Sequence, residues 1–365
     1  MTRAYLDHAA TSPLRAEARA AMEPWWGRPA NASASHREGR AARIALDDAR
    51  DVLAELLGVD RGRVVFTSGG TESDNLAIHN AGGPLLVSAV EHPAVMVPAT
   101  EAGATLIGVD RHGVVDLDHL AHLLDAVDAG GAGRSAALVA VMAVNNEIGT
   151  IQPITEVAEI VAGRARLHCD AVQAMPWLDL RPIGGQVDFL AISAHKFGGP
   201  QGIGVAVVPE PVVALVRGGH QERDRRAGTQ PVASAVGMAA AAAATDADRH
   251  VQVPRVAALA GRLVDAATRW GASETVPAER RTAGHVHLRF AGLDAEALLF
   301  LLDEGGVAAS AASACASGAQ QASSVVEALG VDPTGSVRFS LGHSTTDAEI
   351  DHAIAVIDGA VGRLR

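Results

Sequence analysis

Lys196 is the one lysine among the 30 Lys and Arg residues of this 365-residue chain. Arginine replaces lysine wherever a surface cation is enough, but it keeps its proton and therefore cannot act as an amine nucleophile. Lys196 follows a histidine and precedes the turn sequence Phe-Gly-Gly-Pro. This setting is typical of a Schiff-base lysine, although composition alone is equally compatible with a lysine that persisted by chance.

A carboxylate and an amide follow another candidate strand. Asp170 ends the apolar stretch 166–170 and Gln173 comes three residues later, while Lys196 follows the stretch 189–193. Ligands of open α/β sheets bind at the carboxyl ends of the strands. A carboxylate there can keep a heteroaromatic nitrogen protonated, as pyridoxal phosphate (PLP) requires, or it can simply cap a helix. An acid and an amine at two strand ends together favour a PLP site.

A glycine-rich turn follows the candidate strand 63–67. It reads Ser-Gly-Gly-Thr-Glu-Ser over 68–73 and leads into an apolar helix. Free N–H groups and the positive dipole end of such a helix suit a phosphate, and the Thr71 hydroxyl adds a donor. The same residues also make an ordinary helix N-cap, so the turn alone leaves both interpretations open.

Two further polar groups follow strands at the same predicted edge. His92 comes shortly after the stretch 84–88, where a histidine is either structural or stacks on a cofactor ring and transfers protons. Asn146 follows the stretch 137–143 and would supply an amide there.

The two cysteines, Cys169 and Cys315, lie in unlike surroundings. Cys315 lies in a stretch of small residues, which predicts an exposed and reactive thiol, whereas Cys169 lies inside an apolar strand and is predicted to be structural. Because they are far apart and no export signal is evident, we expect two reduced thiols and no disulfide.

Short apolar runs alternate with amphipathic stretches from about residue 14 to residue 245. The predicted strands are 63–67, 84–88, 104–109, 137–143, 166–170, 189–193 and 205–208, and helical patterns between them include 37–57, 117–127 and 154–162. Strands that alternate with helices predict an α/β fold with a mostly parallel sheet and helices on both faces.

The pattern changes after residue 244. A long helix over 247–270 precedes strands over 285–290 and 336–340, with helices over 294–304 and 323–329. We therefore predict a large α/β domain over 15–245, and a smaller α+β domain formed by 1–14 together with 246–365.

Charge and composition exclude two classes of partner. A net charge of −12 and a pI of about 5.6 argue against a nucleic-acid or membrane surface. The N-terminal residues have no apolar signal core, and the Ala-rich run over 238–244 is far shorter than the ~18–20 apolar residues that a membrane span requires. We expect a cytoplasmic protein.

These ordered motifs resemble the cysteine desulfurases, class-V enzymes of the fold-type-I PLP group, over essentially the whole chain. The matching segments include Tyr-Leu-Asp-His-Ala-Ala-Thr at 5–11, Asn-Ala-Ser-Ala-Ser-His at 31–36, Thr-Ser-Gly-Gly-Thr-Glu-Ser-Asp-Asn-Leu-Ala at 67–77, Val-Asn-Asn-Glu-Ile-Gly at 144–149, Asp-Ala-Val-Gln at 170–173, Ser-Ala-His-Lys at 193–196, Ser-Ala-Cys-Ala-Ser-Gly at 313–318 and Arg-Phe-Ser-Leu-Gly at 338–342.

The resemblance implies a role for each matching residue. It implies that Lys196 binds PLP covalently, Asp170 pairs with the ring nitrogen, Gln173 and Asn146 reach the ring hydroxyl, and His92 stacks on the ring. It implies that Gly70, Thr71, Ser193 and His195 hold the phosphate, with Thr229 reaching the phosphate of a neighbouring subunit. It further implies that Arg338, assisted by Asn31, binds the substrate carboxylate, and that Cys315 is the sulfur-accepting nucleophile. No metal ion is expected.

The implied reaction removes sulfur from L-cysteine, giving L-alanine and a persulfide on Cys315. A homodimer would then pass the sulfur to an acceptor or scaffold protein, in iron–sulfur cluster assembly or a thiolation pathway. A selenocysteine lyase, a C–S lyase or an aminotransferase would keep the PLP chemistry, and a pseudo-enzyme would keep the fold alone. Ala312 stands where the family often has glycine, and Gln-Ala-Ser-Ser at 321–324 replaces Glu-Pro-Ser-His, which bears on the acceptor more than on the reaction.

Overall fold

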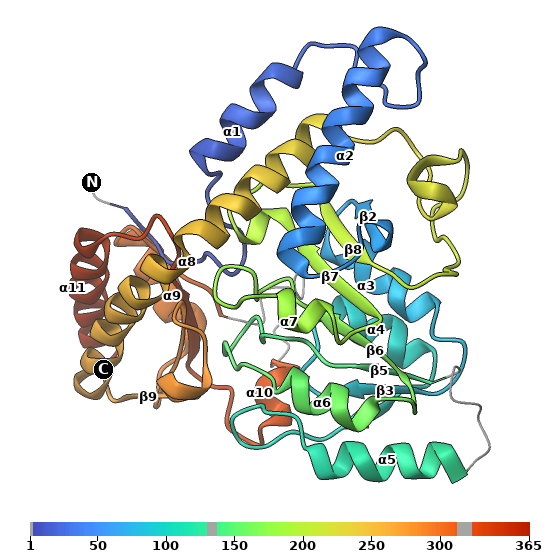
Figure 1. The fold of residues 1–365 in the computed structure, drawn as a ribbon. Helices are drawn as coiled ribbons and strands as arrows, with labels where there is room; N and C mark the ends of the chain where they lie inside the picture. Colours follow the sequence, from blue (N-terminus) through green and yellow to red (C-terminus); the bar gives the residue numbers. More distant parts are fainter. Residues whose placement is uncertain (1–2, 130–136, 312–322) are drawn as a thin grey trace.

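The computed structural model describes residues 3–129, 137–311 and 323–365, and a seven-stranded sheet lies at the centre of the larger part of the molecule (Figure 1). Across the sheet the strands are β2 (Val64–Thr67), β8 (Gly204–Val207), β7 (Phe189–Ser193), β6 (Arg166–Asp170), β5 (Leu138–Ala140), β3 (Leu85–Ser88) and β4 (Thr105–Ile107). β8 runs antiparallel to both its neighbours, and the other pairs are parallel. The predicted α/β fold with a mostly parallel sheet is confirmed, and every predicted strand of the sheet overlaps an observed one.

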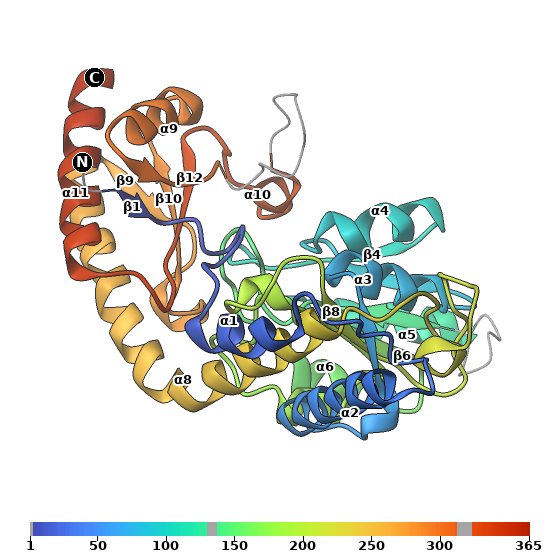
Figure 2. The same cartoon turned by 90° about the horizontal axis from the view of Figure 1, so that it is seen from above.

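Helices cover both faces of the sheet because successive strand residues point to opposite sides. Val64 and Phe66 of β2 belong to one hydrophobic core, and Val65 belongs to another. The first core includes residues of α2 (Arg37–Leu57), α5 (Leu117–Ala129) and α6 (Ile154–Val161), and the second includes residues of α3 (Gly70–His79) and α4 (Pro93–Glu101). Figure 2 shows α3 and α4 on one side of the sheet and α2 and α6 on the other.

A separate core lies under the C-terminal part of the chain. It is built from the antiparallel strands β9 (Ala272–Glu274), β10 (His285–Phe290) and β12 (Ser336–Ser340) and the helices α9 (Ala295–Glu304) and α11 (Asp347–Leu364). The N-terminal strand β1 (Ala4–Tyr5) pairs in parallel with β11 (Val307–Ala308), which brings the start of the chain into this part of the molecule.

The helix α8 (Val232–Ala267) joins the two parts (Figure 1). Its residues up to Ala242 are buried in the large core, and its residues from Val256 onward are buried in the C-terminal core. The boundary predicted at 245/246 therefore falls inside one continuous helix. The division into two domains remains our proposal, which the two separate cores support.

Three shorter helices complete the connections. They are α1 (Ala16–Met22), α7 (Arg181–Gly184) and α10 (Ser324–Ala328). Within the described ranges, no helix is long and apolar enough to cross a lipid bilayer.

Candidate active site

A cavity of about 340 Å³ lies where the carboxyl ends of the central strands meet the C-terminal part of the chain. Ten of the residues singled out in the sequence line it: Gly70, Thr71, His92, Asn146, Asp170, Gln173, Ser193, His195, Lys196 and Arg338. They come from the turns after five strands and from β12, so the fold brings distant segments together as the strand-end argument requires.

Lys196 lies in a short turn directly after β7. Its Nζ donates hydrogen bonds to the backbone oxygens of Ala9 and Ala10, at 2.6 and 2.9 Å. The next turn needs glycine at position 198, where φ is +84° and a Cβ would lie 2.6 Å from the side chain of Arg15. The amine is therefore held at the cavity wall by a tight turn on one side and the N-terminal segment (residues 6–12) on the other.

Asp170 ends β6 and lines the cavity floor, where its Oδ1 accepts a hydrogen bond of 2.8 Å from the backbone N–H of Val172. Two more carboxyl groups, Asp74 and Glu91, are buried nearby. Burial raises the pKa of both well above the ordinary range, and the charge of Asp170 raises each further. Burial and a neighbouring like charge thus both favour the neutral form of Asp74 and Glu91.

His92 caps the N-terminus of α4 and faces the same cavity. Its Nδ1 accepts a hydrogen bond of 3.1 Å from the backbone N–H of Ala94. Burial lowers the pKa of His92, with Asp170 raising it and Lys196 lowering it further. The imidazole is therefore neutral at pH 7 and carries its proton on Nε2.

The opposite end of the cavity is suited to an anion. Gly70 and Thr71 begin α3, whose N-terminal N–H groups are free of intrahelical partners. A Cβ at Gly70 would lie 2.6 Å from the side chain of Val172, so only glycine fits there without displacement. His195 pairs through Nδ1 with the Thr11 hydroxyl at 3.2 Å, and burial and then Lys196 lower its pKa to about 4.

Two amides line the cavity between these ends. Gln173 donates from Nε2 to the backbone oxygen of Ala9 at 2.8 Å. The buried Oδ1 of Asn146 has no hydrogen-bond partner among the described residues. A buried polar atom without a partner indicates that the site is built for a group that supplies one.

Arg338 closes the cavity from β12 and is 5% exposed. Its Nη1 donates to the backbone oxygen of Asn146 at 2.8 Å, and its Nη2 donates to Oδ1 of Asp7 at 2.7 Å. Asp7 and Asp74 are cavity residues that sequence reasoning missed. Both lie in motifs that resemble the family, and their place in those motifs was the available signal.

Three predicted residues are not brought to this cavity by the described part of the single chain. Asn31 and Thr229 are exposed, and Asn31 accepts a hydrogen bond of 2.9 Å from the backbone N–H of Ser33. Cys315 lies outside the described residues. The roles of these three residues remain predictions. Cys169 is fully buried in β6, where burial and then the charge of Asp170 raise the pKa of its thiol well above the usual value.

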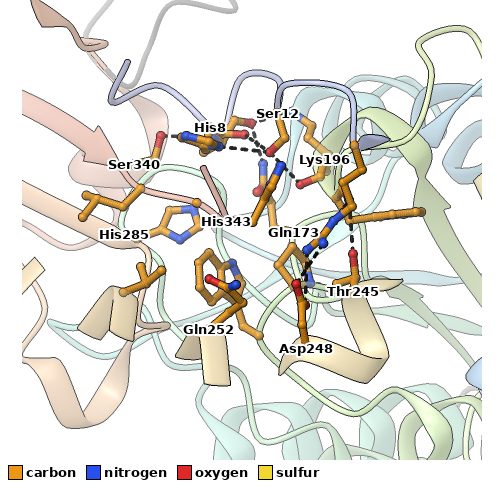
Figure 3. A pocket seen from close by; sticks show the side chains of 18 residues that line it. His8, Ser12, Gln173, Lys196, Thr245, Asp248, Gln252, His285, Ser340 and His343 are labelled. Atoms are coloured by element: carbon orange, nitrogen blue, oxygen red, sulfur yellow. Dashed lines mark hydrogen bonds and ion pairs between the residues drawn. The ribbon is translucent and has the colours of Figure 1, made fainter. Parts of the chain in front are cut away.

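A second, smaller cavity of about 30 Å³ lies behind the N-terminal segment and shares Ala9, Gln173 and Lys196 with the first. Figure 3 shows His8, His285 and His343 gathered around it, together with Asp248. Asp248 forms an ion pair of 2.9 Å with Arg15, which also lines this cavity. Burial lowers the pKa of His8 and His285 to about 3, so both are neutral at pH 7. The N-terminal segment is thus a thin wall between two polar cavities.

Comparison with known proteins agrees with this geometry. Residues 4–353 match the class-V aminotransferase family. An IscS-like cysteine desulfurase of Mycobacterium tuberculosis is 38% identical, over 99% of this chain and 97% of the relative, and a cysteine desulfurase IscS of Dictyoglomus turgidum is 34% identical over 99% and 95%. Among solved structures, a NifS-like protein superposes with a TM-score of 0.91 at 28% identity over 100% of both chains. A NifS-like protein from Rickettsia africae gives a TM-score of 0.90 at 27% identity, over 99% of this chain and 100% of its own.

Proposed function

The chain belongs to the class-V aminotransferase family, among its cysteine desulfurases, and from that premise we propose that it removes sulfur from L-cysteine, releases L-alanine and passes the sulfur from Cys315 to an acceptor protein. One observation carries the proposal: Lys196, Asp170 and Arg338 line one cavity, so an amine, an acid and a carboxylate-binding cation converge on the space that an amino-acid substrate would occupy.

We propose PLP as the cofactor because the lining fits its functional groups. The N-terminus of α3 with Gly70 and Thr71 suits the phosphate, and Ser193 and His195 lie beside it. Asp170 would pair with the ring nitrogen. The Oδ1 of Asn146, which has no partner among the described residues, would accept a hydrogen bond from the ring hydroxyl. When bound, PLP supplies an imine linkage and an electron sink that makes the Cα–H of an amino acid acidic.

The protein's own groups would then bind the substrate and move its protons. Lys196 would hold the cofactor through its amine, and the same Nζ would take up or return a proton at the substrate. Arg338 would bind the substrate carboxylate through paired N–H donors. Neutral His92 holds a proton on Nε2, from which it can donate to a group in the cavity.

Sulfur transfer would use the Cys315 thiolate. It attacks the substrate sulfur, and the C–S bond breaks with its electron pair remaining on the substrate carbon. A proton delivered to that carbon gives alanine, while the sulfur stays on Cys315 as a persulfide. The net change moves one sulfur atom from cysteine to the protein thiol, so atoms and electrons balance without an added oxidant.

The described residues on either side of Cys315 are anchored at the site. Ser310 lines the cavity and exchanges two backbone hydrogen bonds with Arg338, at 2.8 and 3.1 Å. Ser323 donates from its hydroxyl to the buried carboxylate of Glu147. Cys315 is five positions after Ser310 in the sequence, and an extended chain of that length reaches at most ~17 Å. This spacing supports the assignment of Cys315 as the acceptor of the substrate sulfur.

The wider setting belongs to the same proposal. We propose a cytoplasmic homodimer in which Thr229 contacts the phosphate in the neighbouring subunit, and an acceptor or scaffold protein that serves iron–sulfur cluster assembly or thiolation. The name IscS of several relatives supports a sulfur-transfer role.

The test follows one sulfur atom. PLP-loaded protein is incubated with L-cysteine, alanine is measured, and the peptides carrying Cys315 and Cys169 are examined by mass spectrometry. We expect one added sulfur on the Cys315 peptide and none on the Cys169 peptide, because Cys169 is buried. Cys315→Ala should lower alanine release by orders of magnitude, and Cys169→Ser is the matched control. If Cys315→Ala released alanine at the native rate, a lyase that eliminates sulfide would replace the desulfurase proposal.

A further inference from the structure

The Asp7 carboxylate occupies one end of the Arg338 guanidinium. Asp7 Oδ1 accepts a hydrogen bond from Nη2 at 2.7 Å, and the backbone oxygen of Asn146 accepts one from Nη1 at 2.8 Å. Nε of Arg338 is buried and has no hydrogen-bond partner among the described residues. Two nitrogens of the guanidinium, Nη1 and Nη2, therefore have acceptors, whereas the N–H of Nε has none among the described residues.

Both residues of this pair sit on backbone that is itself fixed. The N-terminal segment runs along β12, where the N–H of Ser340 bonds the oxygen of Leu6 at 2.8 Å and the N–H of His8 bonds the oxygen of Ser340 at 3.1 Å. The N–H of Ala9 adds a bond of 2.9 Å to the Ser340 hydroxyl. Asp7 thus approaches Arg338 from a segment whose register against β12 is set by three hydrogen bonds.

We propose that Asp7 is a positioning residue, which fixes the Arg338 guanidinium in the orientation that receives the α-carboxylate of the amino-acid substrate. The inference rests on the proposed function of Arg338 as the carboxylate-binding residue. A free arginine side chain has several rotamers to lose when it binds. Two fixed acceptors remove that freedom in advance, so less of the binding free energy of the carboxylate is spent on ordering Arg338.

Asp7 also supplies the charge that a buried cation needs before substrate arrives, because an unpaired charge away from water is strongly unfavourable. The acceptor and the charge can be separated by substitution. Asp7→Asn keeps an oxygen acceptor in the same place but removes the charge, whereas Asp7→Ala removes both. A positioning role predicts that the alanine variant is the more damaged of the two.

The experiment measures binding of two amines to the PLP-loaded protein through the visible absorbance of the cofactor. L-Alanine carries the α-carboxylate, and ethylamine is the same molecule without it. The dissociation constant of ethylamine divided by that of L-alanine measures how much the carboxylate contributes to binding. We expect Asp7→Ala to lower this ratio by about tenfold or more and Asp7→Asn to change it by less than about threefold, because a charge-assisted hydrogen bond is lost only in the first.

Two further variants make the outcomes distinguishable. Asp248→Ala is the matched control for Asp7→Ala: it removes the acceptor and the charge from a different Arg–Asp pair, in which Arg15 lies 2.9 Å from Asp248 of α8, and it should leave the ratio unchanged. Arg338→Gln should abolish the preference for alanine. An unchanged ratio in Arg338→Gln would defeat the proposed function of Arg338 itself. A normal ratio in Asp7→Ala together with a collapsed ratio in Arg338→Gln would overturn the positioning role alone, as would an equal loss in Asp7→Asn and Asp7→Ala.

Discussion

Replacing Glu222 with glutamine removes the negative charge from its buried ion pair with Arg50. The Glu222 carboxylate accepts from Arg50 at 2.7 and 2.9 Å, from the backbone N–H of Phe66 at 3.0 Å and from Nε2 of Gln230 at 3.0 Å. Its side chain is 1% exposed and that of Arg50 is 7% exposed. This pair anchors the turn that precedes Thr229 to the strand that leads into the glycine-rich turn.

The expected cost follows from these contacts. Breaking a buried pair by removing one charge typically costs 3–5 kcal/mol, so we expect about 3 kcal/mol for Glu222→Gln, whose amide oxygen still accepts part of the donor set. The turn adds to the effect because residues 222, 223 and 224 all have positive φ, at 48°, 55° and 66°. Those left-handed conformations persist when surrounding contacts hold them. A loss of this size is a large share of a typical stability of ~5–15 kcal/mol.

The assay is chemical denaturation followed by circular dichroism, applied as a double-mutant cycle. The cycle compares Glu222→Gln, Arg50→Met and the double variant. Methionine is chosen because its long side chain can still pack over the Phe66 ring, whose centroid lies 4.8 Å from the Arg50 guanidinium carbon. We expect a coupling free energy of ~2–3 kcal/mol, because residues that share one buried network are not additive.

An exposed pair whose carboxylate lies on α2, the helix of Arg50, is the matched control. Arg61 lies 2.9 Å from Asp51, and the two side chains are 45% and 50% exposed. Asp51→Asn should cost less than ~1 kcal/mol, as exposed ion pairs do. A coupling below ~0.5 kcal/mol for the buried pair, or a loss in Glu222→Gln no larger than in Asp51→Asn, would refute the reasoning.

Three further predictions concern the site. Lys196→Arg keeps the positive charge but cannot form an imine, so borohydride should fix the cofactor on the native protein and not on the variant; a reducible adduct on the variant would contradict the assignment. Sedimentation should give a closed dimer of the 37.4 kDa chain, with Thr229→Ala weakening PLP affinity; a fully active monomer would argue against the shared site. Burial, followed by the charges of Arg338, Arg281 and Lys196, lowers the pKa of His285 to about 3 in the folded protein. As pH falls, His285 is therefore protonated in the unfolded chain at a higher pH than in the folded protein. His285 therefore makes stability increase with pH between about 3 and 6.5, and His285→Gln should reduce the slope of unfolding free energy between pH 4.5 and 6 by up to ~1.4 kcal/mol per pH unit. An unchanged slope would count against a buried neutral His285.

Apolar runs bounded by turn residues were enough to predict most of the sheet, because buried parallel strands consist largely of Val, Ile, Leu and Ala. The strand β9 was missed, since it has three residues with a half-exposed pattern and no apolar run. The first half of α8 was also missed. Its Ala-rich stretch has strong helix propensity but no alternation of polar and apolar faces, because several of its alanines are buried.

The strand-end argument predicted most of the cavity lining but none of its long-range pairing. The hydrogen bond between Arg338 and Asp7 joins residues 331 positions apart, and no local pattern encodes such a contact. The raised pKa values of Asp74 and Glu91 were equally hidden, because they depend on burial that arises from several strands at once. Sequence reasoning therefore located ten residues of the cavity lining and missed contacts such as the one between Asp7 and Arg338.

The pairing of the N-terminal segment with β11 and β12 determines when the site can exist during protein synthesis. Residues 6–12 are made on the order of tens of seconds before their partners in β11 and β12, which include Ala308 and Ser340. A nascent chain that has been translated as far as about residue 245 has Lys196 and Asp170 but neither the backbone acceptors docked beside the lysine nor Arg338 opposite it. The amine is thus present well before a complete site, and assembly of that site waits until β12 has been made.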